Sequence, residues 1–431
     1  MLARRSLQVF ALYGGLWSAA ASVGCGASDN DGGAGAGGAT VSSGGALAQG
    51  SGGATAGSSA SGGSSASGGS SASGGSTASG GSTASAGSTG VAAGAGPAAG
   101  YPDGHAAIPT AAQAEDVSKP TTVIGSGTPA SCTAAAFVAA VAQGGTITFD
   151  CGPEPVTITL SEPAKVFNDK GTKLVIDGGD KVTLSGGGKT RILYMATCNK
   201  AQVYPPGSGD CNTNPGVQLV VQNLTFVDGS AKGIADTSNA GGGGAIYAQG
   251  GSLKVHHCRF FNNVCDDLGS DVGGGAIRKL DYLVAPGAGP ARPVWVVNST
   301  FGGEMGRGNS CANGGALSSI GVSWNILNSV LSYNTALGHG ANSGMGGNGG
   351  AIYNDGNEIV LDIKASLLEQ NVANEGGSAV FFVSNNKTGS ITLTDSLTRN
   401  NPRGTFETAG VPGFYVIAKQ PLQNVNSMIL R

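Results

Sequence analysis

"GGGGAIYAQGGSLKVHHCRFFNN", residues 241–263, is the stretch that decides the fold. Glycines open into Ala-Ile-Tyr, a strand-like run with alternating apolar residues follows, and Phe and paired Asn close the unit. The glycine element returns downstream, at Gly243–Ile246, Gly274–Ile277, Gly314–Leu317 and Gly349–Ile352, with a weaker copy at Gly376–Ala379. A phosphate-binding loop needs one glycine cradle followed by a lysine or a helix N-terminus. The recurrence therefore favours a structural repeat over a nucleotide site.

The end of the unit repeats as well. Its final apolar residue falls at Phe226, Phe260, Phe301, Leu331 and Leu368, with separations of 34, 41, 30 and 37 residues. Such a period, with two short strands and a loop of variable length, indicates a solenoid. One unit cannot bury its apolar face alone, so stacked units bury it against each other and equivalent positions form ladders. We therefore predict one register along the axis for Ala245, Ala276, Ala316 and Ala351.

The region 116–431 reads as one all-β domain. Short alternating runs of Val, Ile, Leu and Phe are bounded there by Gly, Asn and Asp, which is typical of strands. The one good helical stretch begins at Cys132, where Phe137, Val138 and Val141 share a face and Gly144 ends the helix. We expect this short helix to cap the N-terminal edge of the β stack, because an exposed edge invites pairing with other chains.

A family resemblance accompanies the repeat. Gly243–Ile246 followed by Phe260 and Asn263 resembles the repeats of chlamydial polymorphic outer membrane proteins and similar bacterial surface proteins. Leu331 to Asn334 and Leu368 to Asn371 follow the same pattern, whereas the Phe301 copy has Glu304 in place of Asn and the last copy has Thr398 before Asn401. "VIDGGDKVTLSGGG", from Val175, resembles an early coil of pectin-lyase-like domains. The resemblance covers residues 121–406 and implies a right-handed parallel β-helix of the pectin-lyase-like class.

The N-terminal residues read as an export signal and a tether. Arg4 and Arg5, a short apolar stretch and small residues up to Cys25 predict a signal peptide at 1–24. "SVGC" resembles the bacterial lipoprotein box and implies lipidation of Cys25, although Ser22 replaces the usual leucine; cleavage after Ala21 is the alternative. Residues 25–115 are mainly Gly, Ala, Ser and Thr. Because they offer little apolar surface to bury, we predict a disordered linker that spans roughly 50 Å.

The asparagines that close the repeats are Asn263, Asn334, Asn371 and Asn401. In a stacked helix such side chains bond along the axis and satisfy buried backbone groups. We therefore predict a structural ladder here and not a ligand site. His256 and His257 are neighbours on a predicted strand and so point to opposite faces, which argues against a shared metal ion.

Two partial catalytic sets compete with this structural interpretation. Asp266, Asp267 and Asp271, with Arg278 or Lys279, could supply the Ca²⁺ ligands and the base of a polysaccharide lyase. A solvated loop is the alternative reading of that cluster. Asp266 and Asp267 are also similar, with His339 in Gly-His-Gly, to the acid–base set of polygalacturonases. That set is incomplete, because over 70 residues separate Asp266 from His339 and no Arg-x-Lys follows.

The chain has eight cysteines. If Cys25 carries a lipid, seven remain, and three pairs are plausible from their positions: Cys132 with Cys151, Cys198 with Cys211, and Cys265 with Cys311. Cys258 aligns with Ser299, Ser329 and Ser366, so we expect it to be a lone buried thiol. Cys-x-x-Cys is absent from the sequence, so zinc is not expected.

The composition narrows the function. Charged residues make up 11% of the chain and the formal net charge is −3, which argues against nucleic-acid binding. We expect a lipid-anchored protein of the outer membrane or cell surface, or a secreted one if Cys25 is not lipidated. We expect a monomer that binds polysaccharide or another cell-surface partner, with no cofactor, no metal ion and no catalytic residues. The alternative is a polysaccharide lyase or a polygalacturonase-like hydrolase acting on acidic glycans.

Overall fold

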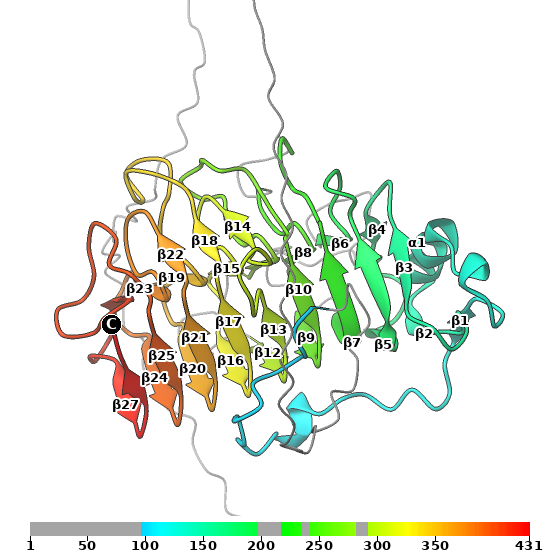
Figure 1. Ribbon diagram of the computed structural model, residues 1–431, viewed down its shortest axis with the longest axis horizontal. Coiled ribbons are helices and arrows are strands. Elements are labelled where there is room, and N and C mark those ends of the chain that lie inside the picture. Colours follow the sequence, from blue (N-terminus) through cyan, green and yellow to red (C-terminus); the bar gives the residue numbers. More distant parts are fainter. Residues whose placement is uncertain (1–95, 197–216, 235–240, 282–291) are drawn as a thin grey trace, which may run out of the picture. The chain divides into compact units, whose positions relative to one another are not determined.

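The computed structural model describes residues 96–196, 217–234, 241–281 and 292–431 (Figure 1). The chain divides into two units, Met1–Ala84 and Ser85–Arg431, and all the described residues belong to the second. The predicted signal peptide and Cys25 lie outside the described residues, as do most of the predicted linker, Cys198 and Cys211. No described helix is long and apolar enough to cross a membrane.

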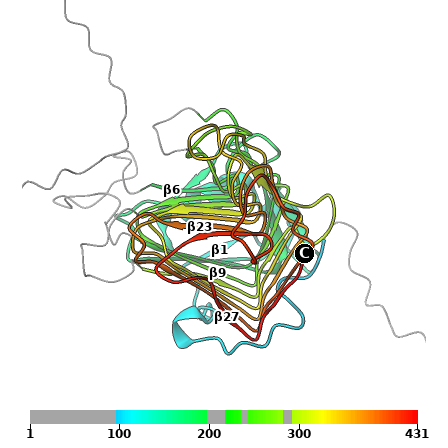
Figure 2. The same ribbon diagram turned by 90° about the vertical axis from the view of Figure 1, so that its left-hand side faces the viewer.

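The second unit is a parallel β-helix, and it confirms the predicted fold class. Figure 2 looks along the stack and shows successive coils lying over one another. One side is a sheet of eight parallel strands. In chain order these are β4 (Ala164–Lys165), β6 (Leu193–Ala196), β8 (Ile246–Gln249), β11 (Ile277–Leu280), β15 (Leu317–Ile320), β19 (Ile352–Gly356), β23 (Val380–Ser384) and β26 (Phe414–Ile417).

A 17-stranded parallel sheet forms the rest of the main wall. Its first strands are β1 (Thr122–Ile124), β2 (Gly145–Phe149), β3 (Val156–Thr159), β5 (Lys173–Ser185), β7 (Gln218–Val227), β9 (Ser252–His256) and β10 (Arg259–Phe261). The later ones are β12 (Val294–Val297), β13 (Thr300–Phe301), β16 (Trp324–Leu327), β17 (Val330–Ser332), β20 (Val360–Lys364), β21 (Leu367–Glu369), β24 (Ser390–Thr394), β25 (Leu397–Arg399), β27 (Gln423–Val425) and β28 (Met428–Ile429). A small third sheet comprises β14 (Ser310–Cys311), β18 (Thr335–Ala336) and β22 (Val372–Ala373).

The predicted register holds along the axis. The alanines of the glycine element are stacked, since the Ala276 N–H donates to the Ala316 carbonyl at 3.1 Å and the Ala316 N–H to the Ala351 carbonyl at 3.1 Å. The rings of Phe226, Phe260 and Phe301 are stacked with centroids 4.8 and 4.5 Å apart. All three are fully buried in one core that runs through the coils.

Each coil turns at corners that need a left-handed residue. Glycine fills one corner, as at Gly243 with φ 67°, while Asn223 with φ 53° and Asn262 with φ 54° serve two others. Glycine, and to a lesser degree asparagine, tolerate this conformation. Gly244 has a different role: a Cβ there would lie 2.5 Å from the Val264 carbonyl oxygen and 2.6 Å from that of Gly275. The Gly-Gly pair thus combines a turn with a close approach between coils.

The asparagine ladder is confirmed, with one member that the sequence analysis missed. Asn263, Asn309, Asn334, Asn371 and Asn401 are buried. From Asn309 on, each side-chain carbonyl accepts from the main-chain N–H and the side-chain amide of the asparagine before it, at 2.9–3.1 Å, and Asn263 Oδ1 accepts from the Gly229 N–H at 2.9 Å. The rung after Asn263 is Asn309. The spacing from Phe301 predicts Glu304 at this rung, but a loop after Phe301 lengthens the coil and moves the rung to Asn309.

A second ladder runs beside the first. The Ser299 and Ser329 hydroxyls each donate to the carbonyl two residues earlier at 2.8 Å, and each accepts from the N–H of the equivalent residue one coil earlier at 3.1 Å. Cys258 occupies the same position at the N-terminal end of this row and is a free, buried thiol, as predicted. Burial raises the pKa of Cys258 to about 12, so the thiol is protonated at neutral pH.

The predicted cap is α1 (Ala134–Gln143). The Thr133 side chain accepts from the Ala136 N–H at 3.2 Å and Gly144 ends the helix with φ 78°. Phe137 and Val141 are fully buried against the first coils. Two short 3-10 turns, η1 (Thr110–Ala112) and η2 (Pro129–Ser131), precede the helix.

Two of the three predicted disulfides are present in the described residues: Cys132–Cys151 beside the cap, and Cys265–Cys311 between consecutive coils. The third, Cys198–Cys211, lies outside the described residues.

The described part of the second unit begins at residue 96, ahead of the change in composition near residue 116. The composition predicts that residues 96–115 belong to the disordered linker and that the domain starts at 116. In the structure the Gly100 N–H donates to Thr300 Oγ1 at 3.0 Å and the Tyr101 N–H to the Asn328 carbonyl at 2.8 Å. The segment runs along the outside of the sheet that contains β9 and β27 (Figures 1 and 2). The small residues of this segment let its backbone lie close to the sheet. A prediction of order from apolar content alone does not detect such a backbone contact.

We predict that Asn334→Ala destabilises the β-helix by roughly 2–4 kcal/mol, because it leaves several buried partners without a hydrogen bond. Denaturant unfolding followed by circular dichroism measures the loss. Asn357→Ala, at an exposed position, is the matched control and should change stability by less than about 0.5 kcal/mol. Equal effects of the two substitutions would contradict a stabilising ladder.

We also predict opposite outcomes at two positions of the serine ladder. Cys258→Ser should be nearly neutral, because a hydroxyl there repeats the bonds of Ser299. Ser329→Ala should cost about 1–3 kcal/mol, since the buried Ser299 N–H loses its acceptor. The same unfolding assay compares them, and a larger loss for the cysteine variant would be inconsistent with the shared position.

Candidate functional site

The charged cluster that the sequence singled out lies on and beside β11. Neighbouring residues of a strand alternate between faces. Ile277 belongs to the central core and Leu280 to a separate cluster on the outer face, so Arg278 points outward and Lys279 inward. The two candidate bases are therefore on opposite sides of the same strand.

Arg278 is fully buried although it faces outward. One terminal nitrogen donates to Ser318 Oγ at 2.5 Å and the other to the main-chain oxygen of Asp271. Asn313 holds the same loop, donating through Nδ2 to the carbonyls of Gly269, Ser270 and Val272 at 2.9–3.1 Å. Arg278 and Asn313 therefore fasten residues 264–272 over the eight-stranded sheet.

The three aspartates do not converge on one point. Asp266 accepts from the Gly233 N–H at 2.8 Å, and Asp267 forms an ion pair with Lys232 at 2.8 Å in which both side chains are about half exposed. No group of three or more His, Cys, Asp or Glu side chains able to hold a metal ion occurs among the residues that the structure describes. The acidic residues of the predicted lyase cluster therefore make separate contacts within loops, and they do not form one site.

Lys279 is buried with Asp281. The Lys279 ammonium lies 3.8 Å from Asp281 Oδ2 and donates to the Leu280 carbonyl at 3.0 Å, while Arg292 contacts the same carboxylate at 3.0 Å. Burial lowers the pKa of Lys279 to about 8, and the charge of Asp281 opposes that shift. The Lys279 ammonium is therefore paired with the Asp281 carboxylate and is not accessible to solvent.

His339 lies in an exposed loop that meets the first one. Within the described part of the chain, no hydrogen bond or ion pair joins His339 to Asp266 or Asp267, so the polygalacturonase-like set is not assembled. The Gly340 N–H donates to Glu375 Oε1 at 2.7 Å, and the Gly269 N–H donates to the Met345 carbonyl at 3.0 Å. The second bond joins residues 338–347 to residues 264–272.

We call these two joined loops, 264–272 and 338–347, the loop platform. Each presents one large apolar side chain to solvent, and Leu268 and Met345 are both 49% exposed. Exposed His339 and Asp267 lie on the same two loops. The platform combines apolar and polar groups on a support fixed by the Cys265–Cys311 disulfide and by Arg278.

Aromatic residues flank the platform on the outer face of the eight-stranded sheet. Tyr353, Phe381 and Tyr415 are stacked with centroids 5.1 and 5.2 Å apart. Burial raises the pKa of Asp355, which hydrogen bonds to the Asn385 amide at 2.9 Å. Tyr353 and Phe381 are buried, and only Tyr415, the last of these three, is partly exposed.

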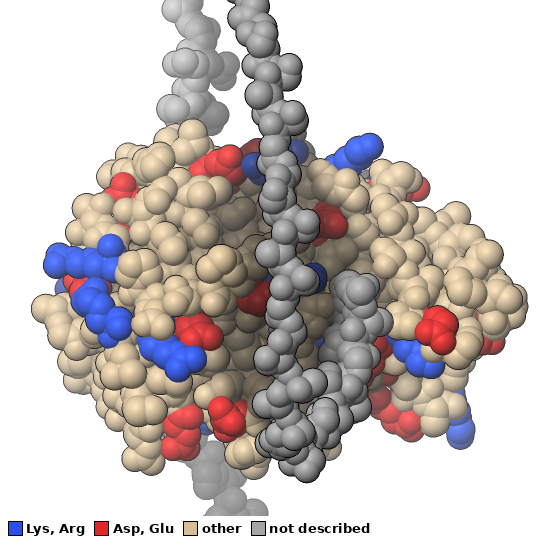
Figure 3. All heavy atoms as spheres, in the orientation of Figure 1, with Lys and Arg blue, Asp and Glu red and all other residues tan. Residues whose placement is uncertain are grey.

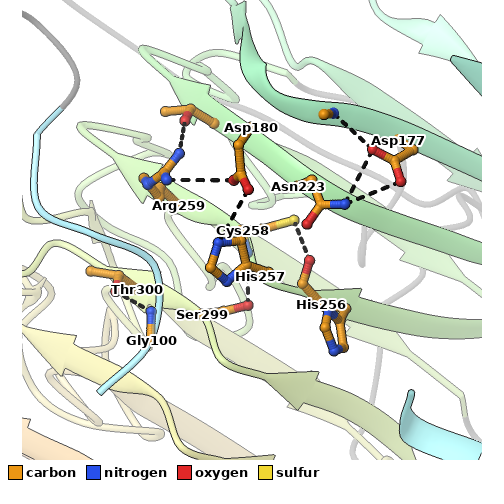
Figure 4. Close-up of polar contacts among 12 residues, drawn as sticks. Gly100, Asp177, Asp180, Asn223, His256, His257, Cys258, Arg259, Ser299 and Thr300 are labelled. Carbon is orange, nitrogen blue, oxygen red and sulfur yellow. Dashed lines mark hydrogen bonds and ion pairs between the residues drawn. The ribbon is translucent and has the colours of Figure 1, made fainter. Parts of the chain in front are cut away.

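A second polar cluster was missed by the sequence analysis (Figure 4). Asp180 contacts His257 Nε2 at 3.3 Å and Arg259 at 3.5 Å, and Arg259 also donates to Thr225 Oγ1 at 3.2 Å. Asp180 lies in an irregularity of β5 between Asp177 and Val182, where β5 and β7 lose register. The only signal in the sequence was Gly-Gly-Asp-Lys in a strand-like run, which does not reveal that Asp180 reaches a later coil.

The two histidines have different surroundings. His256 ends β9, and burial lowers its pKa, with the charges of His257 and Lys254 acting in the same direction. His257 is a left-handed corner residue with φ 52° and is the one that contacts Asp180. The predicted absence of a shared metal ion stays a prediction.

Charges on the face shown in Figure 3 are of both signs and are scattered, without a patch of one sign. A comparison with known proteins finds no matching family model, no similar curated protein and no similar solved structure. The function must therefore be argued from the geometry of this chain.

We predict that His257→Ala raises the pKa of Asp180. Burial alone would raise this pKa, but the hydrogen bond from His257 and the charges of His257 and Arg259 hold it below its ordinary value. Because the pKa of Asp180 is lower in the folded protein, the ionised carboxylate stabilises the fold at any pH above its ordinary pKa. That stabilisation is lost as the pH falls through the lowered pKa of the folded protein. Carboxylate titration by NMR measures the shift, and an unchanged pKa would show that the pair does not interact in solution.

Proposed function

We propose that this chain is an exported, surface-tethered β-helix that binds polysaccharide or another cell-surface partner without catalysing a reaction. The observation that carries the proposal is the loop platform, in which two variable loops join and present Leu268 and Met345 to solvent beside His339 and Asp267. Exposed apolar side chains with polar neighbours are a common feature of interaction sites. Sugar rings and protein surfaces both offer C–H groups for the apolar part and hydroxyl or amide groups for the polar part.

The contacts of the candidate catalytic residues support a binding role. Arg278 and Asp266 hold loops in place, and Lys279 is buried against Asp281. Acid–base catalysis requires groups within reach of a substrate. Signal peptide cleavage, lipidation of Cys25, an outer-membrane or cell-surface location and the pectin-lyase-like relationship belong to the same proposal and are supported by the sequence patterns.

A polysaccharide lyase is the second candidate, and one observation favours it. The cluster of Asp180, His257 and Arg259 is partly open to solvent and combines a carboxylate, an imidazole and a guanidinium. An imidazole could remove a proton from a uronate while a cation neutralises its carboxylate. Release of unsaturated uronide absorbance from pectin or alginate, lost in His257→Ala, would establish this activity and overturn the binding proposal.

We predict that Leu268→Ala/Met345→Ala weakens retention on the bound polysaccharide at least tenfold. A glycan array, together with the activity screen on acidic polysaccharides, identifies the ligand, and titration of the purified variants measures the affinity. Both side chains are exposed, so the free energy of unfolding should change little. Met305→Ala is the matched control, because Met305 is 83% exposed on a different loop. Equal affinity of the platform variant and the control would place the binding surface elsewhere.

A further inference from the structure

We propose that the outer face of β7, β9, β12 and β16 is a binding surface for an extended polypeptide. Residues 96–115, here called the strap, lie across this surface in the single chain, with their first residues continuing onto β10 and β13. The strap of a second copy fills the surface when the chain's own strap is withdrawn. The proposal concerns a different face from the loop platform and does not depend on glycan binding.

The surface recognises the main chain of the strap. Asn328 accepts from the Ala106 N–H at 2.8 Å through Oδ1 and donates to the Ala106 carbonyl at 3.0 Å through Nδ2. Gln222 repeats this pairing on Glu115, accepting from its N–H at 2.8 Å and donating to its carbonyl at 3.0 Å. Two amide side chains that each clamp one residue through both of its backbone groups make a surface suited to extended peptide.

A partly buried ion pair fixes the position of the strap. Lys254, 3% exposed, donates to the Gln113 carbonyl at 2.7 Å and contacts the Glu115 carboxylate, which also pairs with Lys173 at 2.8 Å. The two hydrogen bonds and the charges of Lys254 and Lys173 lower the pKa of Glu115 although burial opposes the shift. The negative strap residue thus meets two positive residues of the surface, and Lys254 has its partners on the strap.

Apolar residues under the strap complete the surface. Val220, Val297 and Leu327 are at most 3% exposed, yet their strand neighbours Val221, Val296 and Ile326 point into the central core. Alternation along a strand therefore directs the first three outward, where they need a cover. Ala112 of the strap is itself fully buried. On β20 and β24, which lie further along the same sheet, the equivalent residues are polar: Asp362, Lys364, Thr392 and Thr394.

The strap behaves as a bound segment and not as part of the wall, because it adds no strand to any sheet. Residues 116–120, which follow it, are exposed or half exposed and lead to β1. A segment that is joined by such a hinge and held by side-chain contacts can exchange between identical chains, since each copy offers the same contacts. A second copy of the chain is therefore the partner that we infer, because its strap carries the same residues that contact the surface in the single chain.

Complementation between two full-length variants tests this. Ala106→Pro/Glu115→Gln has a defective strap and an intact surface, because proline lacks the N–H that Asn328 accepts and glutamine lacks the charge. Gln222→Ala/Lys254→Met has an intact strap and a defective surface. Light scattering should show monomers for each variant alone and a 1:1 dimer in the mixture. A mixture that stays monomeric at 100 µM, roughly the concentration where a weak protein pair becomes populated, would overturn the proposal.

A labelled synthetic peptide of residues 96–118 supplies a second readout. Fluorescence anisotropy should show at least tenfold tighter binding to the strap-defective variant than to the wild-type chain, whose surface is filled. The same peptide with both strap substitutions is the matched control and should bind neither. Hydrogen exchange should show that residues 96–115 lose protection in the strap-defective variant. Retained protection, or equal peptide binding to both chains, would show that the named contacts do not hold the strap.

Discussion

The structure depends on a hydrogen-bonding constraint between neighbouring coils. Each coil turns sharply at its corners, and a sharp turn leaves main-chain groups that cannot pair within the coil. The buried asparagines meet this need, because each side chain accepts from a main-chain N–H of the coil before it and donates to a main-chain carbonyl nearby. The stacking of Phe226, Phe260 and Phe301 then follows, since one register must serve both the amides and the rings. Loops can differ in length wherever the ladder is kept.

The part of the fold that repeats could be predicted from the sequence, and the part that does not repeat could not. Glycine corners, aligned alanines and the place of Cys258 among the serines all follow from period and spacing. Asn309 was missed because the loop after Phe301 displaces it from the expected count. The strap was missed because its sequence has the small residues of a linker, and its attachment depends on partners such as Asn328 that lie more than 200 residues away.

The candidate sites show the same limit. Sequence proximity grouped Asp266, Asp271 and Arg278, and the structure does bring Arg278 to Asp271, but through a main-chain oxygen and out of solvent. Arg278 and Lys279 are neighbours on β11, so their side chains point to opposite faces of the sheet. Grouping charged residues by their closeness in the sequence ignores this separation. Asp180 contacts His257 of a later coil because of an irregularity in β5. Such an irregularity does not repeat along the chain, so the spacing of the repeats does not predict it. Charged residues are scarce in this chain, and most of those near the predicted sites have a structural contact.

The outer faces of the β-helix differ in what covers them, and this decides where a partner can bind. Residues 264–272, fastened by Arg278 and Asn313, lie over the β11 part of the eight-stranded sheet, and the buried aromatic row of β19 and β23 lies beside them. The strap crosses the outer face of β7, β9, β12 and β16 and passes close to the corner at Ala365, and the polar outward residues of β20 and β24 need no cover. Val297 and Leu327, the outward apolar residues of β12 and β16, are at most 3% exposed. Leu268 and Met345 are each 49% exposed on two joined loops with polar neighbours, and this pairing is the reason for placing the proposed binding function on the loop platform.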